Sequence, residues 1–145
     1  MGKKKAKKRI DPKSKKQPRV DQSLEKPFDR TPVWQISTID VDGPWGWKNI
    51  EKTYFFDEII RKIKDFEKMF WKEIIGRNSH EVRVSEISGD AFKRLSELKL
   101  DDIETLVSLR LNGENRLWGI RVENIFKVLW WDPNHDVFPS FKKHT

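Results

Sequence analysis

The chain contains no cysteine, only one tyrosine, and no long run of apolar residues. The lack of cysteine excludes a disulfide framework, cysteine-ligated zinc and a cysteine nucleophile. No stretch of about 18 apolar residues occurs, and no apolar segment of about 7 to 15 residues follows the basic N-terminus. We therefore expect a cytoplasmic protein that neither spans a membrane nor is exported.

Motifs typical of cofactor and hydrolase sites are also absent. The sequence has no glycine-rich phosphate loop before a helix, no GxSxG and no HExxH. The three histidines, His80, His135 and His144, are not at metal-ligand spacing. We expect neither a metal nor a cofactor.

Positive charge is concentrated at the N-terminus. The net charge is +7, but residues 1–20 hold ten of the 30 Lys and Arg and one of the 23 acidic residues, which leaves 20 basic and 22 acidic residues elsewhere. Residues 1–32 are rich in Lys and Pro and poor in apolar side chains, so we predict a disordered basic arm before a folded domain at 33–145. The arm is interpreted either as a solubilising tail or as a segment that binds nucleic acid or directs nuclear import.

The first half of the domain predicts one strand and two helices. Residues 33–41 alternate as a strand, and the turn formers at 42–46 reverse the chain. Apolar residues then recur with a 3.6-residue period, which predicts a helix from Asn49, its expected cap, to Ile75, before Gly76.

A shorter second helix is expected at 89–98, with Ser88 as its N-cap. An extended segment at 82–87 precedes it.

The last third predicts an antiparallel sheet, so the fold class is α+β. Three β-like runs, linked by tight loops, cover 106–111, 116–121 and 125–131. We expect a four-residue first loop that pairs Leu111 with Arg116, and a three-residue second loop that pairs Arg121 with Ile125. A two-residue second loop is the less favoured alternative, because it places Lys127 opposite the apolar Ile120.

In this register one face of the sheet is apolar and the other is mixed. The apolar face, expected to meet the helices, comprises Val107, Leu109, Leu111, Trp118, Ile120, Phe126, Val128 and Trp130. The mixed face comprises Ser108, Arg110, Leu117, Gly119, Arg121, Ile125, Lys127, Leu129 and Trp131.

The cations and the aromatic residue of the mixed face favour a nucleic-acid surface. Arg110, Arg121 and Lys127 would contact phosphates, and Trp131 would stack on a base. An ordinary solvated sheet face is the alternative, although Gly119 within a strand suggests that something approaches closely there.

The C-terminal segment offers groups for proton transfer. In Asp132-Pro133-Asn134-His135-Asp136, a histidine beside carboxylates suits general acid–base catalysis, but the same residues also form turns. Lys142, Lys143 and His144 bring further cations and an imidazole, or simply a solvated terminus.

The order of a strand, helices and an antiparallel meander ending in LWWDPNHDVFPSFKKHT resembles the RelE/ParE superfamily of type II toxins. The resemblance covers about residues 34–145. It implies an α+β toxin fold, a cognate antitoxin partner, and either metal-independent mRNA cleavage on the ribosome or inhibition of DNA gyrase. The tyrosine that several nuclease members carry near the C-terminus has no counterpart, because the only tyrosine is Tyr54.

The leading hypothesis is a ribosome-dependent endoribonuclease. His135 and His144 are the candidates for proton transfer, and Arg121 and Lys127 for charge stabilisation. Candidates for holding RNA are Arg110, Trp131, Lys142 and Lys143. The alternatives are a gyrase-binding toxin and a nucleic-acid-associated domain without catalysis.

Overall fold

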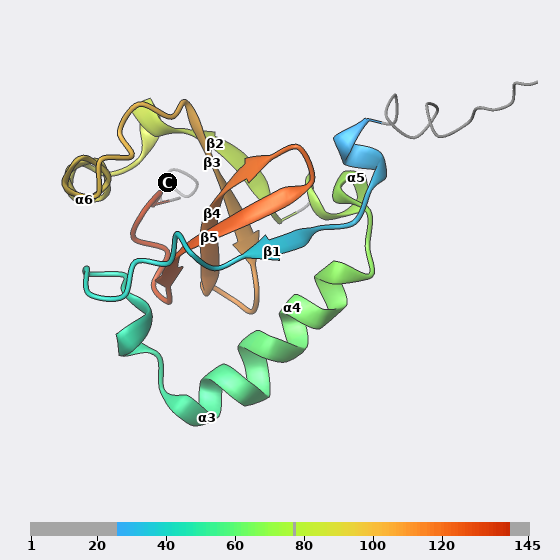
Figure 1. The fold of residues 1–145 in the computed structure, drawn as a ribbon. Helices are drawn as coiled ribbons and strands as arrows, with labels where there is room; N and C mark the ends of the chain where they lie inside the picture. Colours follow the sequence, from blue (N-terminus) through green and yellow to red (C-terminus); the bar gives the residue numbers. More distant parts are fainter. Residues whose placement is uncertain (1–25, 77, 140–145) are drawn as a thin grey trace, which may run out of the picture.

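A five-stranded sheet in the order β1-β5-β4-β3-β2 lies at the centre of the structure, a computed structural model that describes residues 26–76 and 78–139 (Figure 1). The strands are β1 (Val33–Gln35), β2 (His80–Arg83), β3 (Thr105–Arg110), β4 (Arg116–Val122) and β5 (Ile125–Asp132). The helices are α3 (Lys52–Tyr54), the π-helical turn η4 (Phe55–Ile59), α4 (Ile60–Glu67), α5 (Trp71–Ile74) and α6 (Gly89–Glu97), with 3-10 turns η2 (Pro27–Asp29), η3 (Trp47–Asn49) and η5 (Val84–Glu86). The predicted α+β domain is confirmed. No helix in the described ranges is both long and apolar enough to cross a bilayer.

The C-terminal meander forms as predicted. Strands β3, β4 and β5 pair antiparallel in sequence order. The predicted strand at 33–41 is shorter, since β1 ends at Gln35, and it pairs parallel to β5 at the sheet edge. The extended segment predicted at 82–87 is also displaced, because β2 begins at His80 and 84–86 is a 3-10 turn.

The predicted register of the meander is wrong at both loops. Arg110 pairs with Arg116, so the first loop is one residue longer than expected. Val122 pairs with Ile125, which leaves the two-residue second loop and brings Lys127 opposite Ile120.

A β-bulge explains how that disfavoured loop is accommodated. Gly119 pairs with Val128 but Trp118 pairs with Trp130, so Leu129 is an extra residue in β5. A bulge of this kind bends its strand and shifts which side chains share a face. Past the bulge, Trp118 pairs with Trp130 rather than with Val128 as the predicted register requires, but the two indole rings share a face as expected.

Helices pack on both sides of the sheet and bury both of its faces, so the prediction of one buried and one mixed face is wrong. Figure 1 shows α4 and α6 on opposite sides of the sheet. On the α4 side the sheet contributes Val107, Leu109, Leu117, Phe126, Val128 and Trp131 to a core with Ile59, Phe66 and Trp71. On the α6 side it contributes Leu106, Trp118, Ile120, Leu129 and Trp130 to a core with Ala91, Leu95 and Trp45.

The helix predicted from Asn49 to Ile75 is interrupted. It starts after Glu51, and Asn49 instead ends the 3-10 turn η3. Its first part ends at Glu67, with Lys68 as the C-cap, and it restarts as α5 after Phe70, whose backbone is extended. The break lets Trp71 turn fully into the core, where its indole donates a hydrogen bond to the Asn124 carbonyl at 3.0 Å. Burial of this large ring outweighs the continuity of the helix.

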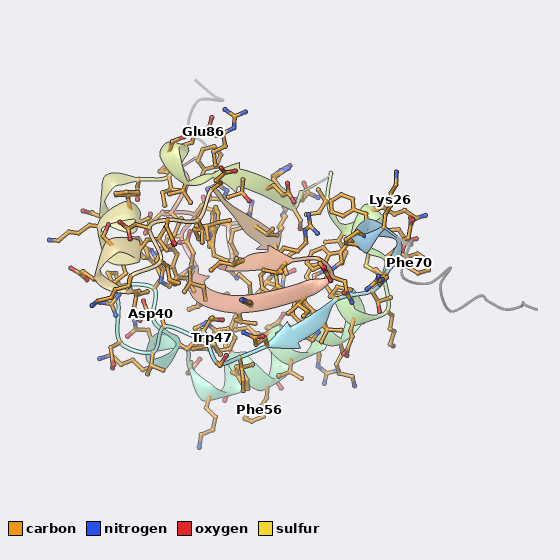
Figure 2. All side chains as sticks on the ribbon, turned by 45° about the horizontal axis from the view of Figure 1, so that its top comes forward. Lys26, Asp40, Trp47, Phe56, Phe70 and Glu86 are labelled. Atoms are coloured by element: carbon orange, nitrogen blue, oxygen red, sulfur yellow. The ribbon has the colours of Figure 1, made fainter. Side chains whose placement is uncertain are left out.

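Aromatic side chains near the start of this helical segment differ in their exposure to solvent. Trp47 contacts Phe55 with ring centroids 6.0 Å apart, whereas Phe56 is 59% exposed and projects outward (Figure 2).

The second predicted helix is confirmed as α6. The Ser88 hydroxyl accepts a hydrogen bond from the Ala91 amide at 3.2 Å, which is the predicted N-cap. Arg94 of this helix joins it to the loop after β1 by donating two hydrogen bonds to the buried Asp40 carboxylate, at 2.8 and 2.9 Å.

Residues 26–32, assigned to the arm from the sequence, contact the domain. Phe28 of η2 lies beside the Arg121 guanidinium, 4.6 Å from it, and the Arg30 carbonyl accepts a hydrogen bond from the Trp71 amide at 3.0 Å. The predicted disorder of the arm is therefore wrong for this part, and residues 1–25 lie outside the described residues.

Candidate nucleic-acid interface

A row of ionisable side chains crosses the sheet where β3 ends, β4 begins and β5 ends. Arg110 pairs with Arg116, which in turn pairs with Asp132. Directly opposed residues of antiparallel strands share a face, so the three side chains lie together. With His135 and Asp136 from the turn after β5, they form what we call the sheet-end cluster.

The two arginines are held by the β3–β4 loop rather than by carboxylates. Arg110 Nε donates to the Gly113 carbonyl at 3.2 Å, and an Arg116 terminal nitrogen donates to the same oxygen at 2.7 Å. Neither forms an ion pair with any residue of the described ranges. Partial burial and the neighbouring Arg110 charge lower the pKa of Arg116, despite the carboxylates of Asp132 and Glu114. This arrangement of two adjacent cations favours an anionic ligand.

Asp132 stabilises a turn, which is the structural role that the sequence offers as the alternative to catalysis. It is fully buried, and its carboxylate accepts hydrogen bonds from the Asp136 and Val137 amides at 2.9 and 3.0 Å and from the Trp118 indole at 3.2 Å. An aspartate that bonds to amides four and five residues ahead stabilises a turn. Asp132 thereby fixes the path of the chain through His135.

His135 and Asp136 are the groups of the cluster suited to proton transfer. His135 has a left-handed backbone, with φ of 61°, and its Nδ1 is buried without a hydrogen-bond partner among the described residues. Partial burial and the charges of Asp132 and Glu114 raise the pKa of Asp136. Ionisable groups with perturbed pKa values, here Arg116 and Asp136, are more common at functional sites than elsewhere.

The other predicted cations do not join the cluster. Arg121 lies on the α4 face, where it forms an ion pair with Glu81 at 2.9 Å and stacks on Phe28. Lys127 shares the face of Arg116 but pairs with Ile120, four residues along β4, which corresponds to roughly 13 Å. The predicted continuous surface of Arg110, Arg121 and Lys127 is therefore wrong.

Two further expectations for the mixed face are corrected. Trp131 is 6% exposed and packs on Tyr54, with ring centroids 5.3 Å apart, so it is not an exposed stacking platform. The close approach expected at Gly119 does occur, but its cause is the core ring of Phe126, which would lie 2.4 Å from an added Cβ. Lys142, Lys143 and His144 lie outside the described residues.

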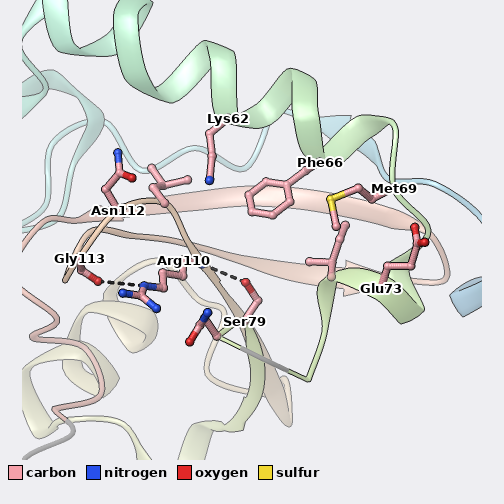
Figure 3. Close-up of a pocket in the computed structure, with 11 residues that line it drawn as sticks. Lys62, Phe66, Met69, Glu73, Ser79, Arg110, Asn112 and Gly113 are labelled. Carbon is pink, nitrogen blue, oxygen red and sulfur yellow. Dashed lines mark hydrogen bonds between the residues drawn. The ribbon is translucent and has the colours of Figure 1, made fainter.

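A groove of about 850 Å³ adjoins the cluster on the side of Arg110. Its walls are α4, the segment after α5 and the β3–β4 loop. Figure 3 shows Lys62 directed from α4 toward Asn112 and Arg110 on the opposite wall, with Phe66 of α4 and Met69 after α4 farther along the groove.

Sequence reasoning missed Arg116, Asp136 and Lys62 as site residues. From the sequence, Arg116 was considered only as the expected partner of Leu111 across the first loop. The available signal was the pair of arginines that flank the Asn112–Asn115 loop, since like charges opposed across a hairpin destabilise it unless they serve another purpose.

No family model, curated protein or solved structure matches this chain. Within residues 26–76 and 78–139 no group of three or more His, Asp or Glu is placed to hold a metal ion.

Proposed function

We propose that this protein binds RNA at the sheet-end cluster and cleaves it without a metal, as an endoribonuclease of the RelE/ParE type. The observation that carries this proposal is the Arg110–Arg116 pair, which forms no ion pair among the described residues and lies beside the turn that holds His135. Two guanidinium groups provide planar donors that match the oxygens of a phosphodiester.

The proposed reaction is attack by the ribose 2′-oxygen on the adjacent phosphorus. A base accepts the 2′-hydroxyl proton, the new O–P bond forms, and the P–O5′ bond breaks while an acid protonates the leaving 5′-oxygen. His135 is assigned as the proton acceptor, and Asp136, whose pKa is raised, as the donor. Arg110 and Arg116 stabilise the charge that develops on the phosphate oxygens.

The order of elements supports the proposed relationship to RelE/ParE toxins. Strand β1 precedes the helices, and the three C-terminal strands form a meander beside it. The chain departs from the pattern that the resemblance implies in three respects: the helical region between residues 49 and 98 is longer than in minimal toxins, a basic arm precedes the domain, and no tyrosine lies near the C-terminus.

Single-turnover cleavage of mRNA on programmed ribosomes tests this function. We expect His135→Ala to slow cleavage by about 10²- to 10⁴-fold, the usual contribution of general acid–base catalysis, with little change in thermal stability. Arg116→Ala should weaken RNA binding and slow cleavage, whereas Arg83→Ala, an exposed arginine on β2, should do neither.

Intact message after incubation with the wild-type protein would refute cleavage. RNA binding without cleavage would identify the non-catalytic alternative, and inhibition of DNA supercoiling the gyrase-binding one.

A further inference from the structure

We infer that the groove between α4 and the β3–β4 loop binds an unpaired nucleotide of the same RNA, which makes single-stranded RNA the preferred ligand. This inference rests on the proposed function and extends it. The groove and the sheet-end cluster share Arg110, so a strand whose phosphate lies at Arg116 would pass directly into the groove.

The charges of the groove match a phosphate. Lys62 on α4 and Arg110 on β3 line opposite walls, and Lys62 makes no ion pair with any residue in the described part of the chain. Both side chains are half-buried, so cations here are less screened than at a fully exposed surface. Among the described residues that line the groove, Glu73 is the only one with a carboxylate, and it already accepts a hydrogen bond from the Phe70 amide at 2.9 Å.

The remaining lining suits a base. Phe66, Met69, Ile74 and Leu111 provide apolar surface, and the Asn78 and Asn112 side chains provide donors and acceptors at the rim. Asn112 is held by a hydrogen bond from its amide nitrogen to Glu58 at 3.0 Å, which leaves its carbonyl oxygen available as an acceptor. Ligand sites combine apolar walls with a few polar groups in this way. In a duplex the bases are stacked and paired, so they cannot enter such a groove.

Fluorescence anisotropy of the full chain with a labelled single-stranded RNA of about ten nucleotides tests the inference. Lys62→Ala removes one phosphate contact, so the slope of log affinity against log salt should become smaller in magnitude by about 0.7. Lys64→Ala is the matched control, because it removes the same charge from an exposed position of α4 outside the groove. Its slope should equal that of the wild type. The same RNA annealed to its complement should bind more weakly than the single strand.

The outcomes separate the two proposals. Equal slopes for Lys62→Ala and Lys64→Ala, or equal affinity for single and double strands, would overturn the groove inference. If Arg116→Ala then still weakens binding, the proposed function stands without the groove. If the wild-type chain does not bind either RNA, both fail.

Discussion

Removing the Asp40 carboxylate should destabilise the domain far more than removing an exposed carboxylate two residues away. The Asp40 side chain is 2% exposed and receives hydrogen bonds from Arg94, from the Trp130 indole at 2.9 Å and from the Gly43 amide at 3.2 Å. Asp40→Asn replaces the carboxylate that neutralises Arg94 with a neutral amide. The NH₂ group of this amide is itself a donor, so it would face N–H groups that now donate to the carboxylate.

The magnitude follows from this burial. Breaking a buried ion pair costs about 3 to 5 kcal/mol, because one charge remains without its partner. The Arg94 side chain is 21% exposed and also bonds to Glu97, so water and Glu97 compensate in part. We expect Asp40→Asn to lower the free energy of unfolding by about 3 kcal/mol.

Asp42→Asn provides the matched control. Asp42 is 78% exposed and lies 3.6 Å from Lys48, so its loss should cost less than about 0.5 kcal/mol. Urea unfolding followed by circular dichroism measures both variants. Similar losses in the two variants would refute the assigned role of Asp40.

The same pair predicts a pH dependence. Burial acts to raise the pKa of Asp40, but hydrogen bonds from Arg94, Trp130 and Gly43 and the charge of Arg94 outweigh it, so the folded pKa lies below the ordinary 3.8. A depressed pKa in the folded state stabilises the protein above the unfolded value, and this contribution is lost as the pH falls through the folded value. The stability difference between the wild type and Asp40→Asn should therefore shrink below about pH 4.

Four substitutions in the sheet test the corrected register. Trp131→Ala and Trp130→Ala should each lower the free energy of unfolding by about 3 to 5 kcal/mol, because both rings are buried. A much smaller loss of stability for Trp131→Ala in urea unfolding would contradict the placement of Trp131 in the core. Gly119→Ala should cost about 1 to 3 kcal/mol or more, since its Cβ would meet the Phe126 ring, and a melting temperature equal to that of the wild type would contradict the bulge. Arg121→Ala should lower the free energy of unfolding by about 1 to 2 kcal/mol, because the contacts with Phe28 and Glu81 are lost, and the RNA affinity should not change. Weaker RNA binding at unchanged stability would show instead that Arg121 belongs to the RNA-binding site.

The elements that could be predicted from the sequence are those with strong local signals. Ser88 before an amphipathic segment predicted α6, and the two polar loops predicted the strands of the meander. The break after Lys68 could not be predicted, because it depends on contacts of Trp71 with Arg30 and Asn124, which are distant in the sequence.

The register and the site failed together because each of the two loops differs by one residue from its predicted length, and a one-residue shift moves a side chain to the opposite face. Arg110 pairs with Arg116 and Lys127 pairs with Ile120, so both cations left the face of Arg121. The bulge at Trp118 and Gly119 keeps Trp131 on the face of Arg121, as predicted, but α4 covers that face and Trp131 is buried there. The uninterrupted apolar run Val128–Trp131 was a signal of burial on both faces, as is typical of covered strands.

Backbone amide chemical shifts recorded while single-stranded RNA is added test the central claim most directly. Binding at the sheet-end cluster predicts the largest changes, within the folded domain, at the amides of Gly113, Asn115, Asp136 and Val137. Largest changes at the opposite end of the sheet, around Val122 and Glu123, would contradict the account.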